Sequence, residues 1–141
     1  MSKGTMMVSG GFDPIHVGHT RLLRDACIQN PYYDLIVALN SDEWLIRKKG
    51  YYFMNWYDRA EILLSIQNVY DVVPVDDADD TVCEAIRRIK PDKFLNGGDR
   101  TPRNTPENDI CAELKIEQQW GIGGDKIRSS SELVQRTSLE V

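Results

Sequence analysis

The chain has 141 residues, 41% of them hydrophobic, and its 22 acidic and 17 basic side chains give a formal net charge of -5. This length supports one compact domain with its own hydrophobic core, so we predict a single domain over residues 1–141. The acidic balance argues against a nucleic-acid or membrane-surface partner, and without a leader-like start or a membrane-length apolar run we expect a cytoplasmic protein.

Short apolar runs alternate with stretches of helical spacing along the chain. The continuous apolar runs predict strands at residues 5–9, 34–39, 71–75, 92–96 and 115–120. The helical spacing predicts helices at residues 19–28, 41–49, 56–67, 81–90, 107–114 and 129–136. Such alternation requires crossover connections and produces a parallel sheet. The predicted fold class is therefore α/β, a Rossmann-like doubly wound parallel sheet of about five strands with helices on both faces.

The stretch GGFDPIHVGH, residues 10–19, joins the first predicted strand to the first predicted helix. Gly10 and Gly11 permit a tight turn that brings the backbone close to a ligand, and a helix N-terminus offers unpaired N–H groups to an anion. His16 and His19 are the only histidines of the chain, and we expect both to face that anion. Imidazoles that donate hydrogen bonds to phosphate oxygens suit phosphoryl or nucleotidyl transfer.

The two histidines also admit two other interpretations, a structural pair near a loop and an incomplete metal site. A metal site would require further His or Cys ligands, and the chain has no third histidine. Cys27, Cys83 and Cys111 are too widely spaced to indicate a zinc site or a disulfide framework. We therefore predict no protein-bound metal.

The signature G-x-F-D-x-x-H-x-G-H belongs to the cytidylyltransferase-like nucleotidyltransferases, and GGFDPIHVGH matches it at every defined position. NSDEWLIRKKG with WYDRAEIL, residues 40–50 and 56–63, resembles the lysine-bearing segment and the arginine helix of this family. KPDKFLNGGDR, residues 90–100, resembles its Gly-Asp turn beside the nucleotide, and RSSSELV, residues 128–134, resembles its Ser-rich helix start at the triphosphate. The resemblance covers nearly the whole chain.

The resemblance implies in-line attack of a substrate phosphate on the α-phosphorus of a nucleoside triphosphate, with Mg²⁺ on the triphosphate and no covalent enzyme intermediate. It also implies a homodimer. The catalytic residues that it implies are His16, His19, Lys48 and Arg59. The nucleotide-binding residues that it implies are Gly10, Gly11, Phe12, Asp13, His16, His19, Gly97, Gly98, Asp99, Arg128, Ser129, Ser130 and Ser131. We expect Lys48, Arg59 and Arg128 to converge on one triphosphate.

Two branches of the family compete for the substrate. We predict transfer of CMP from CTP to a small phosphorylated acceptor, namely a polyol phosphate, a sugar phosphate or a phosphonate. The alternative is transfer of AMP from ATP to a sugar phosphate, since the NSD, KG and GGD elements resemble heptose 1-phosphate adenylyltransferases. The cytidylyltransferases begin their last motif with Arg-Thr-x-Gly-Ile, whereas this chain reads GGDKIRSSS, so Lys126 or Arg128 would supply the missing charge.

Several of these residues have plain structural alternatives. Lys48, with Lys49 beside it, also suits the solvated end of a helix, and Arg59 also suits the exposed face of a packed helix. Asp13 also suits a local turn that holds its loop. Ser129–Ser131 also suit a helix cap. A non-catalytic nucleotide-binding module is the remaining alternative for the whole chain.

Overall fold

The structure is a computed structural model that describes residues 4–98, 105–124, 130, 133 and 134. Strands and helices alternate along it, as predicted. The elements in chain order are β1 (Gly4–Gly10), α1 (Val17–Gln29), β2 (Tyr33–Leu39), α2 (Asp42–Lys49), α3 (Trp56–Leu64), β3 (Val69–Pro74), α4 (Cys83–Ile89), β4 (Lys93–Gly97), α5 (Asn108–Glu113) and β5 (Glu117–Ile122).

The five strands form one sheet in the order β3-β2-β1-β4-β5, and every neighbouring pair is parallel. The predicted fold class is confirmed. β1 lies in the middle, paired with β2 on one side and β4 on the other, so the strand order changes direction there. Ligands of such sheets bind at the carboxyl ends of the strands beside that switch point. The segments that follow β1 and β4 are therefore the expected place for a site.

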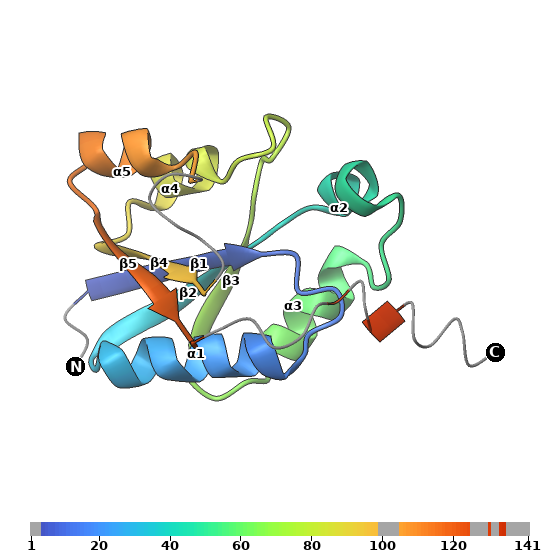
Figure 1. Cartoon of the computed structure of the whole chain (residues 1–141), viewed down its shortest axis with the longest axis horizontal. Coiled ribbons are helices and arrows are strands. Elements are labelled where there is room, and N and C mark those ends of the chain that lie inside the picture. Colours follow the sequence, from blue (N-terminus) through green and yellow to red (C-terminus); the bar gives the residue numbers. More distant parts are fainter. Residues whose placement is uncertain (1–3, 99–104, 125–129, 131–132, 135–141) are drawn as a thin grey trace.

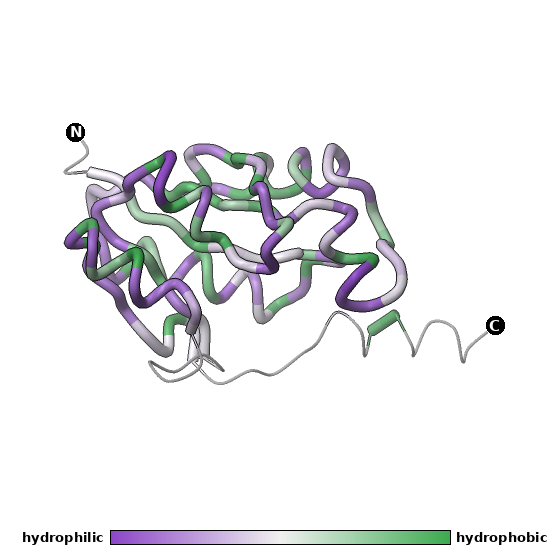
Figure 2. Tube along the Cα trace, turned by 90° about the horizontal axis from the view of Figure 1, so that it is seen from above, coloured by the Kyte–Doolittle hydropathy of each residue, from purple (hydrophilic) through white to green (hydrophobic). Residues whose placement is uncertain are grey.

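Helices cover both faces of the sheet. In Figure 1, α1 and α3 lie on one side, α4 and α5 lie on the other, and α2 lies past the ends of the strands. Each face has its own hydrophobic cluster, one that includes Leu23 of α1 and Leu63 of α3, and one that includes Ile86 of α4 and Ile110 of α5. The helices alternate between hydrophilic and hydrophobic residues along their length (Figure 2), as expected for helices with one face on a sheet.

The last predicted strand and helix need separate comment. β5 begins two residues later than predicted because Lys115 has a positive φ of 57° and the N–H of Ile116 still donates to the carbonyl of Cys111. Ser130, Leu133 and Val134 are helical, and the remainder of the predicted helix 129–136 lies outside the described residues. In the described part of the chain, none of the helices has the length and apolarity that crossing a membrane requires.

Candidate active site

The loop from Gly10 to His16 leaves the carboxyl end of β1 and enters α1. His16 is the N-cap of α1 and His19 is the third helical residue, where the two side chains cap the helix reciprocally. The N–H of Gly18 donates to Nδ1 of His16 and the N–H of His16 donates to Nδ1 of His19, both over 3.1 Å. This is a capping box built from histidines at the spacing usually occupied by Ser or Thr and Glu. The helix begins two residues earlier than predicted, at Val17, so His16 lies just before it and His19 in its first turn.

The capping geometry orients the two rings in the same way. In each ring Nδ1 accepts a backbone hydrogen bond, so Nε2 is the nitrogen that can donate to a ligand. The rings of His16 and His19 stack, with centroids 3.8 Å apart and planes inclined by 24°. The loop therefore presents two aligned imidazoles at the positive end of a 13-residue helix.

Glycines make this geometry possible at two points. A Cβ on Gly18 would lie 2.9 Å from Cε1 of His16, inside the space that the ring occupies. A Cβ on Gly11 would lie 2.9 Å from Cδ2 of Leu45 on α2. The glycines of GGFDPIHVGH thus allow close approach between parts of the protein, in addition to the approach to a ligand that the sequence suggested.

Phe12 and Asp13 are buried, with 4% and 1% of their surfaces exposed. Phe12 has a positive φ of 50° and packs its ring against His19 at a centroid distance of 4.6 Å. The Asp13 carboxylate accepts hydrogen bonds from the N–H groups of Phe53 (2.5 Å) and Met54 (2.7 Å). Asp13 therefore holds the α2–α3 loop against the histidine loop. This long-range role is neither the nucleotide contact that the resemblance implied nor the local turn that was its alternative.

The two lysines at the end of α2 take different directions. Nζ of Lys49 donates to the backbone carbonyl of Asp13 over 3.5 Å, so Lys49 reaches the histidine loop. Nζ of Lys48 lies over the ring of Trp44, 4.6 Å from its centroid. Trp44 itself lies beside the histidine loop, since a Cβ on Gly11 would lie 3.5 Å from its ring. Lys49 thus contacts the loop directly, and the predicted role of Lys48 stays a prediction.

Arg59 requires a correction. Its side chain is fully buried, so it is not the exposed arginine of a packed helix. Its guanidinium also does not present itself to a phosphate, because four N–H···O bonds bind it inside the protein. The acceptors are the carbonyls of Met54 (2.9 Å), Gly11 (2.8 Å) and Asn40 (2.9 Å) and the carboxylate of Asp42 (2.7 Å). Arg59 thus lies beside the histidine loop, but its donors are engaged by three backbone carbonyls and one carboxylate. The expected convergence with Arg128 involves a position outside the described residues.

A buried carboxylate that sequence reasoning missed supports the same region. Asp77, in the segment after β3, accepts hydrogen bonds from the Asn40 amide (3.0 Å), the Ser41 N–H (2.9 Å) and the Ser41 hydroxyl (2.6 Å). The Ser41 hydroxyl in turn accepts the N–H of Trp44 (3.0 Å) as the N-cap of α2. Asp77 therefore fixes the start of α2. The sequence DDADD gives no signal that this acidic residue is buried while its neighbours are exposed.

The other predicted contacts come from the end of β4 and from the late serine segment. Met6 and Met7 of β1 pair with Lys93 and Phe94 of β4, and β4 ends at Gly97 beside the central strand. The hydroxyl of Ser130 donates to the carbonyl of Pro14 over 2.7 Å, so Ser130 contacts the histidine loop. Gly98 follows β4 and is exposed. Asp99, Lys126, Arg128, Ser129 and Ser131 lie outside the described residues.

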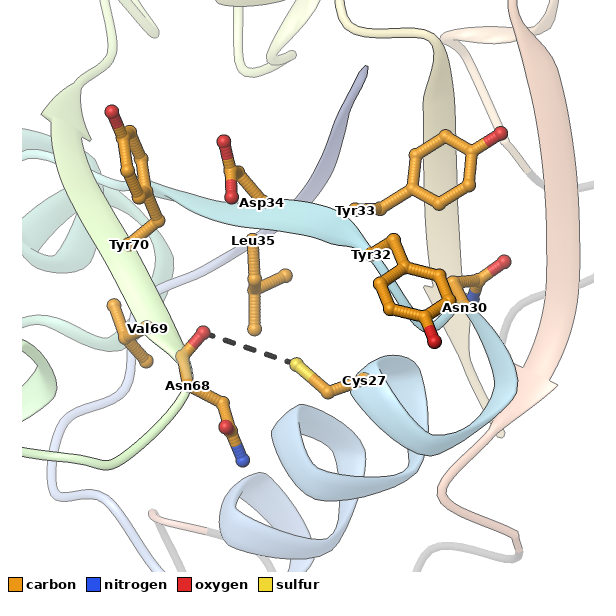
Figure 3. Close-up of a pocket in the computed structure, with 9 residues that line it drawn as sticks. All are labelled: Cys27, Asn30, Tyr32, Tyr33, Asp34, Leu35, Asn68, Val69 and Tyr70. Carbon is orange, nitrogen blue, oxygen red and sulfur yellow. Dashed lines mark hydrogen bonds between the residues drawn. The ribbon is translucent and has the colours of Figure 1, made fainter. Parts of the chain in front are cut away.

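A pocket of about 390 Å³ lies at the amino ends of the strands, where β2 and β3 begin (Figure 3). Tyr32, Tyr33 and Tyr70 line it together with Cys27, whose thiol donates to the carbonyl of Asn68 over 3.9 Å. Burial raises the pKa of the Cys27 thiol. Since the histidine loop leaves the carboxyl end of β1, this pocket is separate from the candidate active site.

A doubly wound parallel sheet whose central strand leads through a glycine-rich loop to paired imidazoles at a helix N-terminus places this chain in the class of α/β proteins built to hold an anionic ligand at the switch point. Comparison with known proteins identifies the family. The model of the family described as Cytidylyltransferase-like matches residues 7–136, and the chain belongs to this family of nucleotidyltransferases.

Two curated relatives carry the name "Bifunctional protein HldE". The protein from Sulfurimonas denitrificans is 38% identical over 117 residues, which cover 81% of this chain and 24% of that protein. The protein from Aliarcobacter butzleri is 36% identical over 119 residues, which cover 82% of this chain and 24% of that protein. The chain thus spans about a quarter of the length of these relatives.

A solved structure has the same fold. The lipopolysaccharide core biosynthesis protein from Thermoplasma volcanium superposes with a TM-score of 0.68 at 18% sequence identity, covering 87% of this chain and 99% of that chain. At this identity the likeness concerns the fold alone.

Proposed function

We propose that this chain transfers AMP from ATP to a phosphorylated sugar and releases pyrophosphate. The observation that carries the proposal is the stacked pair of His16 and His19 at the N-terminus of α1, in a chain of the nucleotidyltransferase family. Imidazoles whose Nδ1 atoms are held by backbone N–H groups keep their Nε2 atoms in fixed directions, so they need no rearrangement during the reaction. Such preorganised donors stabilise charge that develops on phosphate oxygens.

In the proposed reaction an oxygen of the acceptor phosphate forms a bond to the α-phosphorus of the triphosphate. The bond from that phosphorus to the oxygen bridging to the β-phosphate breaks, and pyrophosphate leaves with its electron pair. The N-terminal N–H groups of α1 attract the phosphates, while His16 and His19 donate to oxygens that gain charge. Lys49, beside the histidine loop, adds positive charge to the same region.

Magnesium enters this proposal as part of the triphosphate substrate, held by phosphate oxygens and water. Within residues 4–98 and the described positions beyond them, no group of three or more His, Cys, Asp or Glu side chains could hold a metal ion. Asp13, the carboxylate of the loop, has each of its two oxygens occupied by a backbone N–H. The homodimer stays a prediction that rests on the family resemblance.

The comparisons support ATP over CTP as the nucleotide, in contrast to the preference drawn from the sequence. The curated relatives reported above are HldE proteins, and the NSD, KG and GGD elements of this chain resemble heptose 1-phosphate adenylyltransferases. Both observations favour adenylyl transfer to a sugar phosphate. The proposal specifies the acceptor by its chemical class, a phosphorylated sugar.

A pyrophosphate-release assay tests the proposal. The purified protein is incubated with Mg²⁺ and either ATP or CTP, against a panel of sugar phosphates, glycerol 3-phosphate and a phosphonate, with His19→Ala as the control for background hydrolysis. We expect release with ATP and a sugar phosphate only. Release with CTP alone would establish a cytidylyltransferase. Nucleotide binding in a thermal-shift measurement without release for any pair would indicate a non-catalytic module.

A further inference from the structure

The most unusual group outside the histidine loop is the guanidinium of Arg59. It is the fourth residue of α3, and its side chain is 0% exposed. A buried charge is strongly unfavourable unless its hydrogen-bonding groups are paired. A guanidinium has five N–H donors in a rigid plane, and here four hydrogen bonds of 2.7 to 2.9 Å engage it. Because nearly all donors of Arg59 bind groups of the protein itself, the side chain is suited to holding neighbouring segments in place.

The four acceptors of Arg59 come from three segments around the site, namely the histidine loop, the junction between β2 and α2, and the loop before α3. Gly11 belongs to the histidine loop, Asn40 follows β2, Asp42 is the first residue of α2, and Met54 precedes α3. Three of the four acceptors are backbone carbonyls, so the contacts fix the path of the chain directly. The histidine loop and the helix that carries Lys48 and Lys49 are thus joined through one side chain.

The helix α2 is held mainly by polar contacts at its first turn. It lies past the ends of the strands (Figure 1), and Leu45 is its one buried residue. Packing against the core therefore contributes little to its position. Its first turn is instead held from two sides, by Asp77 through Ser41 and by Arg59 through Asp42.

We propose that Arg59 is a positioning residue that fixes the lysine-bearing helix α2 relative to the histidine loop and does not contact the substrate. The proposal deepens the proposed function and rests on it. The rigid fork of a guanidinium can bind acceptors that lie in different directions, whereas a lysine ammonium is a point charge on a flexible stem. A substitution that keeps the charge but loses the fork therefore cannot replace Arg59.

The test compares Arg59→Lys and Arg59→Met with Arg24→Lys, a matched control at an exposed arginine of α1. Amide hydrogen exchange of the free protein is measured first, without nucleotide. We expect exchange at residues 10–16, 40–45 and 50–55 to accelerate about ten- to hundredfold in both Arg59 variants, with β4 and α4 unchanged. Asp42→Asn removes one partner of the guanidinium and should accelerate exchange at the start of α2 alone.

Kinetics and nucleotide affinity provide the second measurement. Because misplacement of a reacting group by about 1 Å costs about a hundredfold in rate, we expect kcat of both Arg59 variants to fall about a hundredfold. The Kd for the nucleotide should change much less, and lysine should be no better than methionine. Arg24→Lys should retain the wild-type kcat.

Three results would overturn the proposal. Unchanged exchange with a large loss of nucleotide affinity that lysine restores would make Arg59 a phosphate ligand. Faster exchange throughout the protein would reduce its role to overall stability. If the Arg59 variants do not fold, wild-type exchange and kcat in Asp42→Asn would also contradict it. The exchange measurement requires no turnover, so a chain that proves inactive with every nucleotide would refute the proposed function without deciding this inference.

Discussion

Gly18 provides the sharpest test of the histidine site because its substitution should affect activity and stability in different ways. In Gly18→Ala the new Cβ would lie 2.9 Å from Cε1 and 3.1 Å from Nδ1 of His16, closer than side-chain contacts allow. The ring must move, and it then loses its hydrogen bond from the Gly18 N–H and its stacking on His19. Loss of one preorganised donor lowers kcat by about a hundredfold or more, which is about 3 kcal/mol of transition-state stabilisation.

The same substitution should leave the folding free energy almost unchanged. Alanine is favoured over glycine in a helix by up to about 1 kcal/mol, and loss of a helix cap costs about the same amount. Pyrophosphate release gives kcat, and denaturant unfolding gives stability, with Arg24→Ala on the exposed face of the same helix as control. A wild-type kcat in a folded Gly18→Ala protein would show that the position of the His16 ring is irrelevant to transfer.

Three further predictions concern the loop and a buried thiol. His16→Ala and His19→Ala should each lower kcat about a hundredfold and destabilise α1 by about 1 kcal/mol, because each imidazole also caps the helix. A variant that binds nucleotide poorly but keeps the wild-type kcat at saturating nucleotide would contradict this assignment. Asp13→Asn should cost about 2 kcal/mol in denaturant unfolding, because an amide offers one acceptor oxygen where the carboxylate receives the N–H groups of Phe53 and Met54, and an unchanged midpoint would refute that role. Burial and the Glu107 carboxylate raise the pKa of the Cys111 thiol from 9.0 to about 11, so the folded protein retains a proton there that the unfolded chain releases, and this contribution to stability is lost as the pH rises from 9.0 to about 11. Mass spectrometry after iodoacetamide treatment at neutral pH should find Cys111 unmodified in the folded protein, and rapid modification would contradict its burial.

The fold and the place of the histidines could be predicted from the sequence because both depend on local patterns. Continuous apolar runs marked the strands, and the glycines between β1 and α1 marked the turn that brings His16 and His19 to the helix start. The reciprocal capping was also within reach, since the two histidines have the spacing of a capping box. These features involve residues that are close together in the chain.

The roles of Arg59, Asp77 and Lys49 could not be predicted because their partners lie 5 to 48 residues away along the chain and many of them are backbone groups. Three of the acceptors of Arg59 are backbone carbonyls, whose directions depend on the finished fold. Asp77 is one of four acidic residues within DDADD, and only its hydrogen bonds to Asn40 and Ser41 distinguish it. The choice between Lys48 and Lys49 depends on the rotation of α2, which a difference of one residue along the sequence does not reveal.

The hydrogen bond from Ser130 to Pro14 has a consequence for the order of events during synthesis of the chain. It joins positions separated by 116 residues, whereas the last strand of the sheet ends at Ile122. Contacts of such long separation form late, since the chain between them must first be made and ordered. All five strands therefore leave the ribosome before Ser130, which bonds to the histidine loop. A nascent chain can build its sheet while the histidine loop still lacks that contact.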